Sequence, residues 1–222
     1  MINFENMSKY YPTKKGRHYV FKAINTQLPT DQNIGILGPN GVGKSTLIKI
    51  LGGADKPSEG QITSTQKISW PLGLQGGLQG SMSARENVRF VARIHGYKNT
   101  KDIEQQVADF AEIGEHFDEP VKSYSSGMSS KIKFGLATAF DFNFDVLLID
   151  ELRAVGDAKF KQKSTEILTE RYKNKTIIMV SHSMSELRKF CQAGVLIKNK
   201  SLVFHPLLEN AIKDYEVTYA SK

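Results

Sequence analysis

The chain has 222 residues and a formal net charge of +7, and its 40% hydrophobic and 24% charged residues are typical of a globular protein rather than a disordered or fibrous one. Its longest apolar runs are much shorter than the roughly 18–20 residues that span a bilayer, and its N-terminus lacks the features of a secretory signal, so we expect a cytoplasmic protein. Because the lysines are scattered and mostly flanked by acids, the positive charge favours a solvated surface over a nucleic-acid-binding one.

The first 34 residues are predicted to form antiparallel β-structure. Near-alternating apolar residues run through 2–7 and 19–28, with a turn-prone segment from Pro12 to Gly16 between them. A compact apolar strand over 34–37 then enters a glycine-rich turn, and a helical pattern follows over 44–51. The order strand, glycine loop, helix matters for the chemistry below.

Residues 80–140 are predicted to be a helical insert, because Ser83 and Glu86 form a capping-box pattern and two amphipathic runs follow. The rest of the chain alternates between strand and helix, as strands 146–149 and 176–180, helices 158–172 and from Met184, a hairpin over 195–204 and a helix opened by Pro206. This alternation predicts an α/β fold with a mainly parallel core sheet. With no linker in evidence, we expect one domain over 1–222.

Two side chains are predicted to be structural. The only cysteine, Cys191, has no partner for an internal disulfide and no neighbouring metal ligands, so we expect a buried thiol. Trp70 could resemble a sugar-stacking platform, but a buried aromatic is the favoured interpretation.

A phosphate-binding loop is predicted between the strand 34–37 and the helix 44–51. The pattern G-x-x-x-x-G-K-[ST] is met by Gly38, Pro39, Asn40, Gly41, Val42, Gly43, Lys44 and Ser45, followed by Thr46. Glycines let successive N–H groups point into one cavity, and the helix adds its positive end. Lys44 is expected to reach the β- and γ-phosphates of ATP and Ser45 to coordinate Mg²⁺.

Two acids end the strand 146–149, and a histidine follows a neighbouring strand. We expect Asp150 to hold Mg²⁺ through water and Glu151 to orient and deprotonate the attacking water. His182, after the strand 176–180, is expected to hydrogen-bond the γ-phosphate and keep Glu151 and the water in line. The phosphate loop alone indicates binding of a nucleoside triphosphate and Mg²⁺, which kinases, GTPases and motors share.

The segment Tyr124-Ser125-Ser126-Gly127-Met128 resembles the L-S-G-G-Q signature of ABC ATPases, and the order of motifs along the chain is that of the family. The resemblance implies a head-to-tail homodimer that sandwiches two ATP molecules, each contacted in trans by the signature residues Ser125, Ser126 and Gly127. It also implies that Asp157 is the D-loop aspartate at the dimer seam. Tyr11 matches the aromatic residue that stacks on adenine, with Tyr10 less favoured.

Three residues depart from the family pattern. Ser126 replaces the first signature glycine, Met128 replaces the glutamine, and Arg153 stands where a small or polar residue is usual. The Q-loop glutamine, which contacts Mg²⁺ and senses the membrane subunit, is either Gln75 or Gln79, with Gln75 favoured.

Six short strings, spread over nearly the whole chain, make it similar to the ATP-binding proteins of bacterial group 2 capsular polysaccharide export; they begin at Gly16, Ser69, Gly80, Arg85, Tyr124 and Ala154. This likeness implies integral membrane permease subunits as partners, indirect periplasmic and outer-membrane export partners, and a place on the cytoplasmic face of the inner membrane. It implies no separate carbohydrate-binding domain.

Other functions stay open. An ABC ATPase could serve export of another polysaccharide, such as O-antigen or teichoic acid, and a cassette acting on ribosomes or nucleic acid would usually carry two cassettes or a coiled-coil insert. A P-loop kinase would need a basic clamp for its second substrate and would lack the signature segment.

Overall fold

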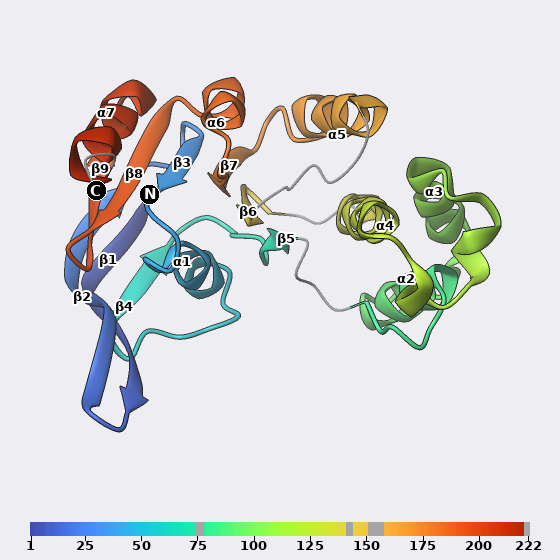
Figure 1. Ribbon diagram of the computed structural model, residues 1–222, viewed down its shortest axis with the longest axis horizontal. Helices are drawn as coiled ribbons and strands as arrows, with labels where there is room; N and C mark the ends of the chain where they lie inside the picture. The colour runs from blue at the N-terminus through green and yellow to red at the C-terminus, as the bar shows by residue number, and fades with distance from the viewer. Residues whose placement is uncertain (74–77, 141–143, 151–157, 220–222) are drawn as a thin grey trace. The chain divides into compact units, whose positions relative to one another are not determined.

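The computed structural model describes residues 1–73, 78–140, 144–150 and 158–219. The chain folds into two compact units, the first made of Met1–Pro71, Asn143–Glu151 and Asn174–Lys222, the second of Leu72–Phe142 and Leu152–Lys173. Each unit is built from segments that are distant in sequence (Figure 1).

The first unit begins with a three-stranded antiparallel sheet of order β2-β1-β4, formed by β1 (Ile2–Thr13), β2 (Gly16–Leu28) and β4 (Glu59–Ser64). One face of this sheet is apolar and buried, as the burial of Ile2, Phe4 and Leu28 shows. The predicted β-structure is confirmed, although both strands extend further into the hairpin than expected and β4 was not predicted.

A second sheet in this unit carries the phosphate loop. Its strands in the order β6-β7-β3-β8-β9 are β6 (Val146–Asp150), β7 (Thr176–Val180), β3 (Ile34–Leu37), β8 (Ala193–Lys198) and β9 (Ser201–His205). The first four run parallel and β9 is antiparallel to β8. The parallel strands are continuous apolar runs and are almost wholly buried, as in sheets covered on both faces.

Three helices complete the first unit (Figure 1): α1 (Lys44–Leu51), which packs against β6, α6 (Met184–Phe190), and α7 (Leu208–Tyr219), which packs against β3 and β8. The core between the sheets includes Phe21 of β2, Ile48 of α1 and Leu148 of β6. This close-packed core supports the strand and the helix that flank the phosphate loop.

The second unit is mainly helical, with α2 (Ala84–Ile94), α3 (Lys101–Ala111), α4 (Ser126–Ala139), α5 (Ala158–Arg171), the 3₁₀ turns η1 (Gly114–Asp118) and η2 (Val121–Ser123), and the short strand β5 (Leu72–Gly73). The predicted capping box is confirmed, because the Ser83 hydroxyl accepts from the Glu86 N–H at 3.1 Å and Glu86 Oε2 accepts from the Ser83 N–H at 2.8 Å. The core of this unit joins α2, α3 and α4.

A buried carboxylate ties α2 to α3. Glu104 accepts two hydrogen bonds from Arg89, at 2.9 and 3.1 Å, and one from the Thr100 hydroxyl at 2.7 Å. The Arg89 guanidinium holds the pKa of Glu104 below its usual value despite burial. Because a buried charge is costly unless it is paired and hydrogen-bonded, this network specifies how the two helices pack.

Of the two side chains predicted to be buried, one is buried and the other is exposed. Cys191 is buried, as expected, and burial raises the pKa of its thiol to about 12. The prediction of a buried Trp70 was wrong, since the residue is 40% exposed. The apolar character of a side chain alone does not show whether it lies in the core or on the surface. Within the described residues, no helix combines the length and apolar character required to cross a bilayer.

Candidate nucleotide site

The phosphate loop connects the buried strand β3 to the start of α1. Three of its glycines have positive φ, Gly38 with φ 155°, Gly41 with φ 77° and Gly43 with φ 115°, a conformation that strains other residues. A Cβ atom at position 43 would lie 2.4 Å from Cγ1 of Val20 and 3.1 Å from Cζ of Phe21. Gly43 is also the N-cap of α1, whose first turn has no acidic residue. The loop therefore presents backbone N–H groups at the positive end of a helix, which suits a phosphate.

Lys44 lies over the loop's own backbone. Its ammonium group donates to the carbonyl of Gly38 at 2.8 Å and to that of Pro39 at 3.0 Å, and the residue is only 7% exposed. The charge is thus held beside the loop's N–H groups, and a phosphate that replaced these carbonyls as acceptor would gain a stronger, charge-assisted hydrogen bond.

Ser45 and Asp150 join the two predicted magnesium motifs. The Ser45 hydroxyl donates to Oδ1 of Asp150 at 3.2 Å, although the residues are far apart in sequence. Asp150 is the last residue of β6 and is 6% exposed. Hydroxyl and carboxylate oxygens are the kind of ligand that Mg²⁺ prefers, so the residues present at this point fit the ion.

The strand register brings a third segment to the same sheet edge. Val180 of β7 pairs with Asp150 of β6 on one side and with Ile36 of β3 on the other. His182 follows Val180 by two residues and is exposed. Because parallel strands end at one edge of their sheet, His182 lies between the strand that enters the phosphate loop and the strand that ends at Asp150.

Several predicted site residues, Gln75, Glu151 and Asp157, with the departure Arg153, lie outside the described residues. Their proposed roles stay predictions. Glu151 directly follows Asp150 in the sequence, so its position in the chain is consistent with a role beside the magnesium motif.

Tyr11 lies on the face of the β1–β2 hairpin that borders the phosphate loop. Lys9 pairs with Phe21, whose ring would touch a side chain at position 43, and Tyr11, two residues on along β1, shares the face of Lys9. The Lys9 ammonium lies 5.1 Å from the Tyr11 ring centroid, and the Tyr11 hydroxyl donates to Asp55 at 3.3 Å. Tyr11 is 43% exposed, which leaves part of its ring open to a ligand.

Tyr10 points to the other face of the hairpin. Its ring lies 5.1 Å from that of Tyr19, and the Arg17 guanidinium lies 4.5 Å from its centroid. Since the Tyr10 ring is covered by these neighbours, the geometry favours Tyr11 over Tyr10 for contact with adenine.

The signature segment lies in the second unit and begins α4. Ser125 is the N-cap of this helix, and its hydroxyl accepts from the Met128 N–H at 3.2 Å. Ser125 and Ser126 are exposed. The residue before them, Tyr124, donates through its hydroxyl to the His116 carbonyl at 2.5 Å. The start of α4 is therefore exposed, and the hydrogen bond of Tyr124 holds the residue that precedes it in place.

Gln79, the second candidate for the Q-loop, is anchored through its backbone. The buried Asn87 side chain accepts from the Gln79 N–H at 2.7 Å and donates to the Gln79 carbonyl at 3.2 Å. The Gln79 side chain is exposed. This anchor fixes the backbone of Gln79 against the first turn of α2.

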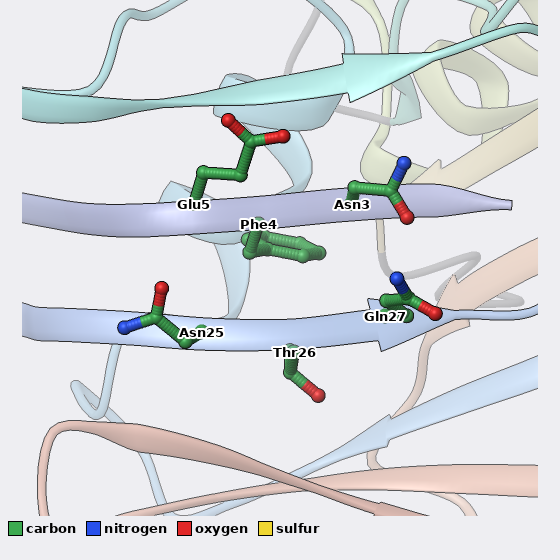
Figure 2. Close-up of a pocket in the computed structure, with 6 residues that line it drawn as sticks. All are labelled: Asn3, Phe4, Glu5, Asn25, Thr26 and Gln27. Carbon is green, nitrogen blue, oxygen red and sulfur yellow. The ribbon is translucent and has the colours of Figure 1, made fainter.

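A surface hollow of about 340 Å³ lies on the antiparallel sheet. Figure 2 shows its six lining residues on the adjacent strands β1 and β2, namely Asn3, Phe4, Glu5, Asn25, Thr26 and Gln27. None of these six residues belongs to a predicted nucleotide motif.

Comparison with known proteins identifies the family, because the ABC transporter family description matches residues 21–154, more than half of the chain. The chain belongs to the ABC transporter family. Its predicted fold class is confirmed by solved cassette structures, among them a dimeric ATP-binding cassette in a post-hydrolysis state bound to ADP and Pi. That structure has a TM-score of 0.72 at 24% identity, covering 91% of this chain and 96% of the other.

Three curated relatives are similar over almost their full length. The polysialic acid transport ATP-binding protein KpsT of Escherichia coli is 44% identical over 98% of this chain and 97% of its own. The ATP-binding protein BexA of Haemophilus influenzae is 38% identical over 98% of this chain and 99% of its own. A third relative, the capsule polysaccharide export ATP-binding protein CtrD of Neisseria meningitidis serogroup B, is 38% identical over 97% of this chain and 98% of its own. The resemblance to capsule-export ATP-binding proteins noted from the sequence is therefore confirmed.

Two contacts were not predicted: the hydrogen bond from the Tyr124 hydroxyl to the His116 carbonyl, and that from the Ser181 hydroxyl to the Glu186 carboxylate in the turn after β7. The Tyr124 hydroxyl gives no sequence signal beyond an aromatic residue before a helix. Glu186 could have been noticed, because Ser183 and Glu186 have capping-box spacing directly after His182, but spacing does not tell where the carboxylate points.

Proposed function

We propose that the chain is the ATP-hydrolysing subunit of an ABC exporter that powers the translocation of capsular polysaccharide across the bacterial inner membrane. The observation that carries the catalytic part is the hydrogen bond between Ser45 and Asp150 at 3.2 Å, which joins the phosphate loop to the acidic strand end. The polysaccharide part is supported by the likeness to KpsT and BexA over nearly full length.

In this proposal Lys44 and the loop N–H groups bind the phosphates of ATP, and Ser45 and Asp150 hold Mg²⁺. Bound Mg²⁺ would neutralise charge that develops on the phosphate oxygens. Glu151 takes a proton from the attacking water, and His182 donates a hydrogen bond to the γ-phosphate. Tyr11 stacks on the adenine ring.

The second part of the proposal is a homodimer, in which the signature residues of one subunit contact the nucleotide bound to the other. The exposed Ser125 at the start of α4 supports it, since helix N-termini attract phosphate. Asp157 lies at the seam of this dimer. ATP shifts the population of open and closed dimers only by its differential affinity for the closed one, so the contact in trans is as important as the pocket.

The proposed partners are integral membrane permease subunits, with periplasmic and outer-membrane export proteins reached only indirectly and no nucleic acid. The chain would lie on the cytoplasmic face of the inner membrane, held there by its permease. On α2, Phe90 and Ile94 are 57% and 65% exposed and lie one turn apart, which supports contact between the helical unit and a partner.

Polysaccharides other than capsule are the nearest alternative. The O-antigen export ATP-binding protein RfbB of Klebsiella pneumoniae is 32% identical over 91% of this chain, and a teichoic acids export ATP-binding protein of Staphylococcus epidermidis is 34% identical over 97%. The higher identity to KpsT, 44% over 98% of this chain, and the likeness to the capsule polysaccharide export protein CtrD over 97% of this chain favour capsular polysaccharide.

The test is ATP hydrolysis by the full chain, alone and with its copurified membrane partner, in the wild type and the Glu151→Gln variant. We expect hydrolysis to fall by about 10²–10⁴-fold, the contribution of a positioned general base, while ATP binding is retained. A Glu209→Gln variant, which alters an exposed carboxylate on α7, should hydrolyse ATP normally. Unchanged turnover in Glu151→Gln would refute the assignment, and stimulation by nucleic acid in place of a permease would refute export.

A further inference from the structure

The turn between β7 and α6 contains a relay of hydrogen bonds that differs from an ordinary helix cap. The Ser183 hydroxyl accepts from the Glu186 N–H at 3.3 Å, which is the first half of a capping box. In the second half, the glutamate carboxylate would accept from the N-cap N–H. Here the Ser183 N–H donates instead to the Ser181 hydroxyl oxygen at 3.0 Å, and the Ser181 hydroxyl donates to Oε2 of Glu186.

The residues of this relay lie on both sides of His182 in the sequence. Ser181 precedes the histidine and Ser183 follows it, so both flanking residues are tied through Ser181 to one carboxylate. A hydrogen bond to an ionised acceptor is about twice as strong as one between neutral groups. Glu186 and Ser181 are half-buried, whereas His182 is exposed, so the carboxylate restrains the backbone from which an exposed imidazole projects.

The position of the turn makes that restraint relevant to catalysis. The register that pairs Val180 with Asp150 and Ile36 places the turn between the magnesium motif and the strand that enters the phosphate loop. An imidazole there acts on a γ-phosphate only if it is held at hydrogen-bonding distance, and small misplacements of such a group are costly to the rate.

We propose that Glu186 is a positioning residue, which holds the Ser181–Ser183 turn so that the His182 imidazole meets the γ-phosphate. The inference rests on the proposed function, because it assumes ATP hydrolysis that depends on His182. Glu186 itself touches neither the nucleotide nor the attacking water.

A merely structural role predicts a different result. If Glu186 only stabilised α6, its loss would lower the unfolding temperature and act independently of His182. If it positions His182, its loss acts through the imidazole, so the two substitutions together cost no more than His182→Ala alone. Such non-additivity is the mark of groups that work as a unit.

The experiment measures steady-state ATP hydrolysis, ATP affinity and thermal unfolding of the full chain with its membrane partner. We expect Glu186→Ala to lower kcat roughly 10- to 100-fold, the range for a displaced catalytic group, with little change in ATP affinity or Tm. Ser181→Ala should act in the same direction. Glu186→Gln, which keeps an acceptor oxygen at the same reach, should restore most of the rate.

The matched control is Glu209→Ala, which removes a carboxylate of α7 that pairs with Arg188 of α6 at 2.8 Å. This variant should leave kcat unchanged. Normal turnover in Glu186→Ala, or losses that multiply in Glu186→Ala/His182→Ala, would overturn the positioning role while the ATPase function stands. If His182→Ala itself hydrolyses ATP normally, the inference also fails. A wild-type chain that does not hydrolyse ATP would overturn the proposed function as well.

Discussion

Replacing Gly43 with alanine should disable the phosphate loop through two separate costs. The first is backbone strain, about 1–2 kcal/mol for a side chain at left-handed φ, since Gly43 has φ 115°. The second is overpacking, typically about 1–3 kcal/mol, because the new Cβ would lie 2.4 Å from Val20 Cγ1 and 3.1 Å from Phe21 Cζ. Phe21 belongs to the core and cannot yield freely. We expect Gly43→Ala to lose about 2–5 kcal/mol in the free energy of unfolding if the costs add.

Two other glycines separate these costs. A Cβ at Gly41 (φ 77°) or at Gly53 (φ 71°) would meet no atom within 4 Å, so alanine there carries only the strain. Urea unfolding gives the stability of each variant, and titration with a fluorescent ATP analogue gives its affinity. Gly53→Ala should bind nucleotide normally because position 53 is outside the loop. The double variant Gly43→Ala/Val20→Ala should recover part of the stability. If Gly43→Ala proves as stable as Gly41→Ala, the packing argument is refuted.

Two further predictions concern the second unit. Tyr124→Phe should lower the free energy of unfolding, measured in urea, by about 1–3 kcal/mol. The reason is that the Ala84 N–H, which donates to the Tyr124 hydroxyl at 3.3 Å, loses its acceptor. An unchanged midpoint of unfolding would contradict this. Hydrogen bonds from Lys159 and Lys163 lower the pKa of Glu112 to about 2, so its contribution to stability is present above the unfolded value near 4.5 and is lost as pH falls toward 2. Glu112→Gln should therefore flatten the fall in stability between these pH values, and parallel wild-type and variant curves would rule the ion pairs out as its cause.

Most elements of the fold could be predicted because their sequences satisfy local rules. The parallel strands are uninterrupted apolar runs, α1 follows a glycine loop, and α2 has a capping box whose two hydrogen bonds form as expected. What was missed depends on contacts that local rules do not describe. The strand β4 is largely exposed and exists because it pairs with β1, so neither face of it shows an apolar pattern.

In the candidate site, too, local features could be predicted and contacts between distant segments could not. The phosphate loop could be predicted residue by residue, since its chemistry is carried by consecutive backbone groups. The contact of Ser45 with Asp150 was expected only as shared magnesium binding, because it requires β6 and the start of α1 to meet in space. The direction of the Glu186 carboxylate could not be predicted, because the Ser183 N–H, three residues before it, and the Ser181 hydroxyl, five residues before it, are alternative donors.

The departures from the signature pattern at Ser126 and Met128 leave the cap of α4 intact. A serine hydroxyl has one donor and two acceptor positions, and the cap of α4 uses only an acceptor of Ser125, toward the Met128 N–H. Its proton is thus not consumed by the cap and suits a phosphate oxygen. Met128 contributes its backbone N–H to this cap, which any residue other than proline would supply. Ser126 likewise offers its carbonyl, to the Ser130 hydroxyl at 2.9 Å. The replaced side chains therefore alter the surface of the helix start, while the Ser125 hydroxyl and the backbone groups of the cap are kept.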